Sequence, residues 1–232
     1  TTVYPDPNPE TTTTDGAVQS LIVGQLQADW DTAHDATAGS GPSPVDVDDE
    51  ASSVRSGFTA TQTVIDRMHT GFDTSSIPDG DTISAGVYSL YVQSTSNGDN
   101  DGDDFIAVVT DTPASNTALV DGDFDQIGNA INNPTEQHDS GQRKDISGMS
   151  TSAYTDWTLN ATGRGNISKT GVTNFGAREG HDIIDSLYAG AANTTNQALC
   201  SMAETAGTGE DPKLVVTHAV PFAASRAIVI VT

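Results

Sequence analysis

An acidic loop, Asn97 to Asp104, carries the side chains of this sequence that are best suited to bind a cation. It reads NGDNDGDD, in which oxygen-bearing side chains alternate and Gly102 allows a sharp bend, as in the first half of a calcium loop. Val108 stands where an EF-hand needs a bidentate Glu, so the loop is not an EF-hand. We expect a weak calcium site here; a solvated hairpin turn that binds nothing is the alternative. The predicted calcium ligands are Asn97, Asp99, Asp101 and Asp103.

Two further acidic groups invite the same question. Carboxylates placed close together repel one another, and a bound cation relieves that repulsion, but most charge runs are solvated surface. We interpret both groups as solvated surface, with cation binding as the second interpretation. The first group is Asp46, Asp48, Asp49 and Glu50, and the second is Asp121, Asp123 and Asp125.

Catalytic motifs are absent from the sequence. The five histidines are scattered, no HExxH places two of them one helical turn apart, and no serine stands in a GxSxG elbow. We interpret the neighbours His181 and Asp182 as a loop or strand-end pair rather than a catalytic dyad. Cys200 has no cationic neighbour that would activate it, and its apolar setting predicts a small buried hydrophobe. The sequence predicts a non-catalytic protein.

Composition limits the partners of the chain. Its 232 residues include 32 acidic and 9 basic ones, which gives a formal charge of −23. Such a negative field repels phosphate backbones and anionic bilayers, so nucleic-acid binding is not expected. No apolar run approaches the length of a membrane span, so membrane insertion is not expected either. A single cysteine excludes an internal disulfide.

The elements that would position these residues are mostly short strands. Pro78 and Gly80 form a turn that leads into an alternating strand, whose buried face is predicted to hold Ile83, Ala85, Val87 and either Ser89 or Leu90. Short strands separated by turn residues are typical of a sandwich. We expect strands at 17–23, 54–59, 61–69, 82–93, 104–111, 155–159, 172–178, 198–204, 213–218 and 227–231, a long loop over 33–50, and short helices within 117–131 and 161–170.

Three segments in order resemble a known family. They read GFDTSSIPDGDTIS from Gly71, TDWTLNATGRGNISKTGVTNFGAR from Thr155 and GEDPKLVVT from Gly209. This pattern resembles the DNRLRE-domain group of β-sandwiches, which is related to carbohydrate-binding module family 96 and also occurs in structural proteins of phage and other virions. The resemblance covers roughly residues 17–218. It departs from the family in the strand before Phe72, which lacks the usual arginine-rich run, and in the added residues 219–232.

The resemblance implies an all-β fold, an antiparallel β-sandwich of the jelly-roll kind with one or two short helices. Residues 17–218 would form the sandwich, 1–16 an extended N-terminal arm, and 219–232 a C-terminal extension with a terminal strand. The matched residues are turn formers and core positions, so they indicate fold more than function.

Both ends of the chain are expected to take part in assembly. The arm carries three alternating prolines and cannot be helical, and the uncharged β-branched run near the end would aggregate if it were left exposed. Pairing with the edge of a neighbouring copy would protect it. The predicted assembly residues are Tyr4, Pro5, Ala227, Ile228, Val229, Ile230 and Val231.

We therefore expect a structural subunit of a virion surface (capsid decoration, tail or fibre) or of an extracellular filament. Its partners would be copies of itself and other virion or filament proteins. The alternative is a secreted carbohydrate-binding module that binds a host-surface glycan through aromatic faces. The aromatic candidates for that role are Trp30, Trp157, Tyr88 and Tyr91, and for Trp157 a core position is the favoured interpretation.

Overall fold

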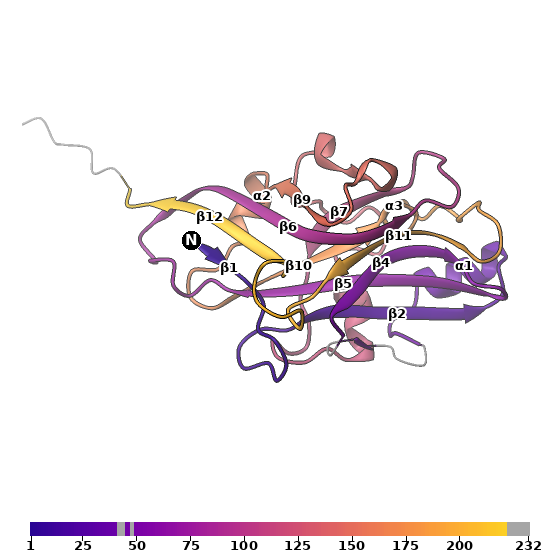
Figure 1. Cartoon of the computed structure of the whole chain (residues 1–232), viewed down its shortest axis with the longest axis horizontal. Coiled ribbons are helices and arrows are strands. Elements are labelled where there is room, and N and C mark those ends of the chain that lie inside the picture. Colours follow the sequence, from indigo (N-terminus) through magenta and orange to yellow (C-terminus); the bar gives the residue numbers. More distant parts are fainter. Residues whose placement is uncertain (41–44, 47–48, 222–232) are drawn as a thin grey trace, which may run out of the picture.

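The computed structural model describes residues 1–40, 45–46 and 49–221, with side chains for 1–40 and 49–221. The predicted terminal strand 227–231, with its five assembly residues, lies outside this range, as do Asp48 and the side chain of Asp46. Figure 1 shows an elongated molecule made almost wholly of strands, with short helices at its margins.

The described strands form one curled antiparallel sheet, which confirms the expected all-β sandwich. They are β1 (Thr2–Val3), β2 (Asp15–Val23), β3 (Val45–Asp46), β4 (Ala51–Phe58), β5 (Gln62–Asp73), β6 (Thr82–Ser96), β7 (Phe105–Thr110), β8 (Lys144–Asp145), β9 (Ala153–Thr158), β10 (Val172–Glu179), β11 (Thr194–Ser201) and β12 (Lys213–Ala219). Their order is β1-β12-β6-β11-β4-β5-β10-β7-β8, with β2 on β5, β3 on β2 and β9 on β6.

Two long strands let this sheet curl. Along β6, the first part pairs with β12, the middle with β9 and the end with β11. Along β5, one end pairs with β4 and the other with β10, while β2 follows most of the opposite edge. Because each long strand changes partners, the sheet folds over and encloses side chains from both halves.

The main core lies inside this curl. It takes residues from β4 to β7 and from β9 to β12, among them Phe72, Tyr88, Trp157 and Phe175. The rings of Phe72, Trp157 and Phe175 surround Tyr88 with centroids 5.9–6.1 Å from its own. A second, smaller core on the outer face gathers Val18, Phe58 and Ile65 of the sheet with residues from its covering segments, Trp30 and Phe124 among them.

The buried face of β6 differs from the prediction. Tyr88, Leu90 and Val92 point into the main core, whereas Ala85 and Val87 are only half-buried. Ile83 packs against the core from its edge, and Ser89 is buried on the other face. The cause is a bulge: Thr217 pairs with Ala85 but His218 pairs with Ile83, so Ser84 is an extra residue that reverses which side chains face the core, and simple alternation from Ile83 gives the wrong side.

Helices are short. They are α1 (Gln27–His34), α2 (Ala161–Gly165) and α3 (Gly180–Ile184), with 3-10 turns η1 (Asp121–Gln126), η2 (Ser140–Gln142) and η3 (Ile146–Gly148). The predicted helices at 117–131 and 161–170 shrink to η1 and α2. Helices α1 and α3 were not expected. The predicted loop over 33–50 contains the end of α1 and the short strand β3, and it ends directly before β4.

Candidate metal centre

A loop and a helix far apart in sequence meet at one end of the molecule. The loop is the acidic segment 97–104 between β6 and β7, and the helix is α3, which begins directly after β10. Gly180, the first residue of α3, lies against the backbone carbonyl of Asp103 so closely that any Cβ at this position would collide with it. Glycine therefore permits the close approach of helix and loop.

Three side chains converge at this contact. His181 Nε2 lies 3.3 Å from Asp99 Oδ2 and 3.4 Å from Asp101 Oδ2. The side chains of His181 and Asp99 are 0 % and 4 % exposed, and that of Asp101 is 37 % exposed. One ligand atom from each residue lies within 4.8 Å of the other two, so the group can hold a metal ion.

A second layer of polar groups supports the cluster. Glu179, fully buried, accepts a hydrogen bond from the Ser56 hydroxyl and one of 2.9 Å from the His181 backbone amide. Its Oε1 lies 3.2 Å from His181 Nδ1. Asn196 on β11 donates to Asp99 Oδ1 at 2.8 Å and to Glu179 Oε1 at 3.3 Å. The Ala189 amide donates to Asp99 Oδ2 at 3.2 Å.

The electrostatics of His181 follow from these neighbours. Burial lowers its pKa, but the hydrogen bond to Glu179 and the charges of Glu179, Asp99 and Asp101 outweigh burial and raise the pKa to about 9. Burial raises the pKa of Glu179, against the opposing effect of His181. The space between Nε2 and the two aspartates thus favours positive charge, supplied either by a proton or by a cation.

Asp182, the next residue, serves a different purpose. It accepts hydrogen bonds from Arg67 (Nη2, 2.7 Å) and Arg178 (Nε, 2.6 Å), and all three side chains are buried. Burial acts to raise the pKa of Asp182, but Arg178 and Arg67 hold it well below its usual range, while burial and Arg67 lower the pKa of Arg178 to about 10. His181 and Asp182 have different partners, and both lie in the short helix α3 rather than in the predicted loop or strand end.

The predicted calcium ligands are only partly brought together. Asp99 and Asp101 converge, and they do so with His181. Asn97 uses its amide within the loop, donating to Asp104 and accepting from the Asn100 backbone. Asp103 belongs to the loop but not to the three-residue group. Sequence reasoning missed His181, Glu179 and Asn196.

Several of the other candidate residues are buried inside the fold, where they have structural roles. Asp123 is buried and accepts the amides of Ala114 and Val120 at 2.8 Å each, so it closes a turn rather than facing solvent. Trp157 is 1 % exposed and Cys200 is buried, which confirms both as core residues. Trp30 and Tyr88 are also fully buried.

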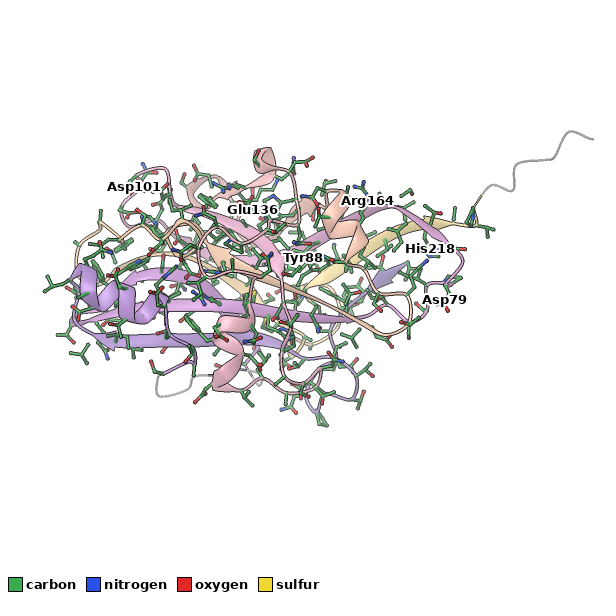
Figure 2. All side chains as sticks on the ribbon, turned by 180° about the vertical axis from the view of Figure 1, so that it is seen from behind. Asp79, Tyr88, Asp101, Glu136, Arg164 and His218 are labelled. Atoms are coloured by element: carbon green, nitrogen blue, oxygen red, sulfur yellow. The ribbon has the colours of Figure 1, made fainter. Side chains whose placement is uncertain are left out.

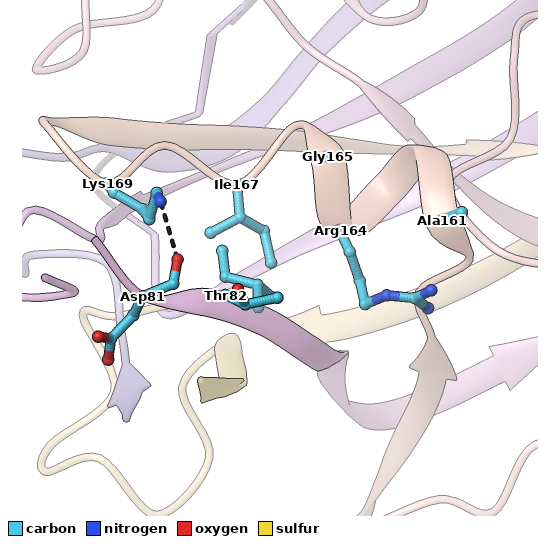
Figure 3. Close-up of a pocket in the computed structure, with 8 residues that line it drawn as sticks. Asp81, Thr82, Ala161, Arg164, Gly165, Ile167 and Lys169 are labelled. Atoms are coloured by element: carbon cyan, nitrogen blue, oxygen red, sulfur yellow. Dashed lines mark hydrogen bonds between the residues drawn. The ribbon is translucent and has the colours of Figure 1, made fainter. Parts of the chain in front are cut away.

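A pocket of about 430 Å³ lies where the start of β6 faces α2, and Figure 3 shows the residues that line it. Lys169 and Arg164 line it, and Asp81 is the single carboxylate among the described residues that line it. Lys169 Nζ donates to the Asp81 carbonyl at 2.9 Å, and the Asp81 carboxylate lies 2.7 Å from His218 Nδ1. This pocket does not provide the pair of carboxylates that glycoside hydrolysis requires.

Neither the models of known protein families nor the curated proteins contain a match to this chain. Within the part of the chain that the structure describes, no helix is both long enough and apolar enough to cross a membrane.

Proposed function

We propose that this chain is a non-catalytic structural protein, a subunit of a virion surface or of an extracellular filament. It would assemble with copies of itself and with other virion or filament proteins through edge strands and terminal arms. The observation that carries the proposal is the way in which the edge of β12 is completed by a strand from the distant N-terminal arm.

That strand, β1, adds to β12 in antiparallel register, with Thr2 opposite Val215 and Val3 opposite Leu214. Beside it, the Thr1 amino group donates to the Val216 carbonyl at 2.9 Å, and the Val216 amide donates to the Thr1 carbonyl at 2.8 Å. Figure 1 shows this short strand beside β12, on the side away from β6. The edge therefore accepts strand addition, and a copy of the same arm from a neighbour offers the same hydrogen bonds.

Tyr4 and Pro5 follow β1 directly. Pro5 is buried, and with Pro7 it borders a pocket of about 290 Å³ beside the segment from Ala203 to Thr208. An arm held by two strand residues and a few side-chain contacts can be exchanged between copies at little enthalpic loss, because the contacts made are the same.

A cation in loop 97–104 forms a second part of the proposal. Calcium is the ion that the alternating oxygen donors of the sequence favour. The imidazole of His181 among the donors favours zinc and its first-row neighbours instead.

A carbohydrate-binding module is the second candidate. Three of its four proposed aromatic residues are buried, but Tyr91 is half-buried and packs edge-on against Tyr154 with centroids 5.3 Å apart. Tyr154 also borders a pocket of about 360 Å³. An aromatic pair beside a pocket is the kind of surface on which a sugar ring stacks.

Light scattering of the purified chain, with and without chelator, tests these alternatives. The structural proposal predicts a regular particle or polymer whose mass falls when Val3 is replaced by proline, which cannot donate to the β12 edge. The matched control is Thr2→Pro in the same strand, because Thr1 and Val216 exchange the hydrogen bonds and the Thr2 amide therefore points away from β12. A monomer at all concentrations contradicts assembly, and a monomer retarded by polysaccharide gels supports the carbohydrate-binding alternative.

A further inference from the structure

The donor set at Asp99, Asp101 and His181 differs in kind from the predicted calcium loop. Calcium is bound almost entirely by oxygen and takes six to eight ligands, whereas imidazole nitrogen suits zinc and its first-row neighbours. Here a buried imidazole nitrogen joins Asp99 and Asp101, whereas the other two predicted oxygen donors, Asn97 and Asp103, do not belong to the group. His181 Nε2 is buried and has no hydrogen-bond partner, and it faces the two carboxylates.

Two of the three separations between donor atoms fit a small ion. With metal–ligand distances of about 2.0–2.1 Å, a tetrahedral site places its ligand atoms about 3.3–3.4 Å apart. The two nitrogen–oxygen separations are 3.3 and 3.4 Å. Charge-assisted hydrogen bonds between an imidazolium and a carboxylate are shorter, about 2.7–2.9 Å.

Hydrogen-bond counting orients the imidazole for this role. Asn196 Nδ2 lies 2.8 Å from Asp99 Oδ1, 3.3 Å from Glu179 Oε1 and 3.4 Å from His181 Nδ1; it has two amide hydrogens, and the two carboxylates, at the shorter distances, accept both. The proton on His181 Nδ1 is then donated to Glu179 Oε1, 3.2 Å away, which leaves Nε2 as the nitrogen that a cation can bind in place of a proton. A carboxylate that holds the far nitrogen of a ligating histidine is the usual support of a zinc site.

Of the two aspartate ligands, one is held in place by hydrogen bonds and the other is open to solvent. Asp99 is fixed by Asn196 and by the Ala189 amide, and it is almost fully buried. Asp101 is 37 % exposed, so the outer side of the cluster is accessible to an ion and to a solvent ligand.

We propose that Asp99, Asp101 and His181 bind a divalent cation of the zinc class, with solvent completing a four-coordinate site. The ion fastens the β6–β7 loop to α3. This proposal does not depend on assembly through β12, because Asp101 and His218 lie toward opposite ends of the molecule in Figure 2.

Titration calorimetry of the chelator-treated full chain with zinc chloride, and separately with calcium chloride, tests the proposal. We expect one zinc ion per chain and at least tenfold weaker binding of calcium. Asp101→Asn removes a ligand charge from an exposed side chain and should weaken zinc binding by about tenfold or more. Asp103→Asn removes the same charge from the same loop and should leave zinc affinity within about threefold, since surface charges contribute little.

His181→Gln is the second variant, and circular dichroism shows whether each variant is folded. Cobalt substitution gives an independent readout, because tetrahedral cobalt absorbs visible light far more strongly than octahedral cobalt. No zinc heat, calcium binding as tight as zinc binding, or an equal loss in Asp101→Asn and Asp103→Asn would overturn the proposal. A folded His181→Gln variant that binds zinc like the wild type would overturn it as well.

Discussion

Glu179 Oε1 and His181 Nδ1 lie 3.2 Å apart across the start of α3, both fully buried. The same glutamate accepts the His181 backbone amide, so it fixes the start of the helix and the direction of the ring together. This contact aims Nε2 at Asp99 and Asp101. A two-residue spacing at the end of β10 therefore determines which nitrogen faces the acidic loop.

Glu179→Gln tests this positioning role. Glutamine keeps an oxygen that accepts from Nδ1 but loses the charge that makes the imidazole a better ligand. We expect zinc affinity to fall by about 10- to 100-fold, measured by competition with a chelating dye. Glu136→Gln, a charge-matched change outside the cluster, serves as the control. Equal zinc affinity in wild type and Glu179→Gln would mean that Glu179 supports the fold only.

The sequence predicted the strands well because their signals are local. Turn residues such as Pro78 and Gly80 stand shortly before β6, and apolar residues fill most of β7. The buried face of β6 could not be predicted, because the bulge at Ser84 that reverses the alternation arises from pairing with the distant strand β12. Helix α1 was missed because its stability comes from tertiary burial of Trp30 and Ala33 rather than from a strong local pattern.

Only the loop residues of the metal centre could be predicted, because only they form a local pattern in the sequence. The alternation of Asp99 and Asp101 is visible in the loop. His181 lies 80 positions beyond Asp101, and only the packing of α3 against the loop brings it there. A local signal did exist: Glu179 and His181 flank a glycine at a strand end, the arrangement in which a carboxylate can orient a neighbouring ring. Without the fold, nothing connects that signal to the loop.

A second prediction concerns Asp182, which joins Arg67 and Arg178 in the interior. Asp182→Asn leaves two buried guanidinium groups without a counter-charge, so we expect the free energy of unfolding to fall by about 3–5 kcal/mol. Urea denaturation of the metal-free chain measures it. Asp156→Asn removes the same charge from an exposed position on β9 and should change stability by no more than about 0.5 kcal/mol. A similar small effect for both variants would contradict a structural role for the buried trio.

The last prediction concerns Asp211, whose buried carboxyl lies two residues before the first residue of β12. Burial and the charge of Glu204 raise its pKa from 3.8 to about 6. The folded chain therefore keeps this proton at pH values where the unfolded chain has lost it. Asp211 contributes stability below the unfolded pKa, and this contribution is lost as pH rises from about 4 to about 6.

In Asp211→Asn the side chain is neutral at every pH, so this loss cannot occur. Melting temperatures of wild type and variant, measured with chelator from pH 4 to pH 8, should diverge as pH rises toward 6 and differ by a constant amount above it. Wild type loses stability relative to the variant over that interval, whatever fixed offset the substitution adds through packing. Asp156→Asn, exposed on β9, should show no such divergence. A difference between wild type and Asp211→Asn that stays constant from pH 4 to pH 8 would show that Asp211 ionises alike in the folded and unfolded chain.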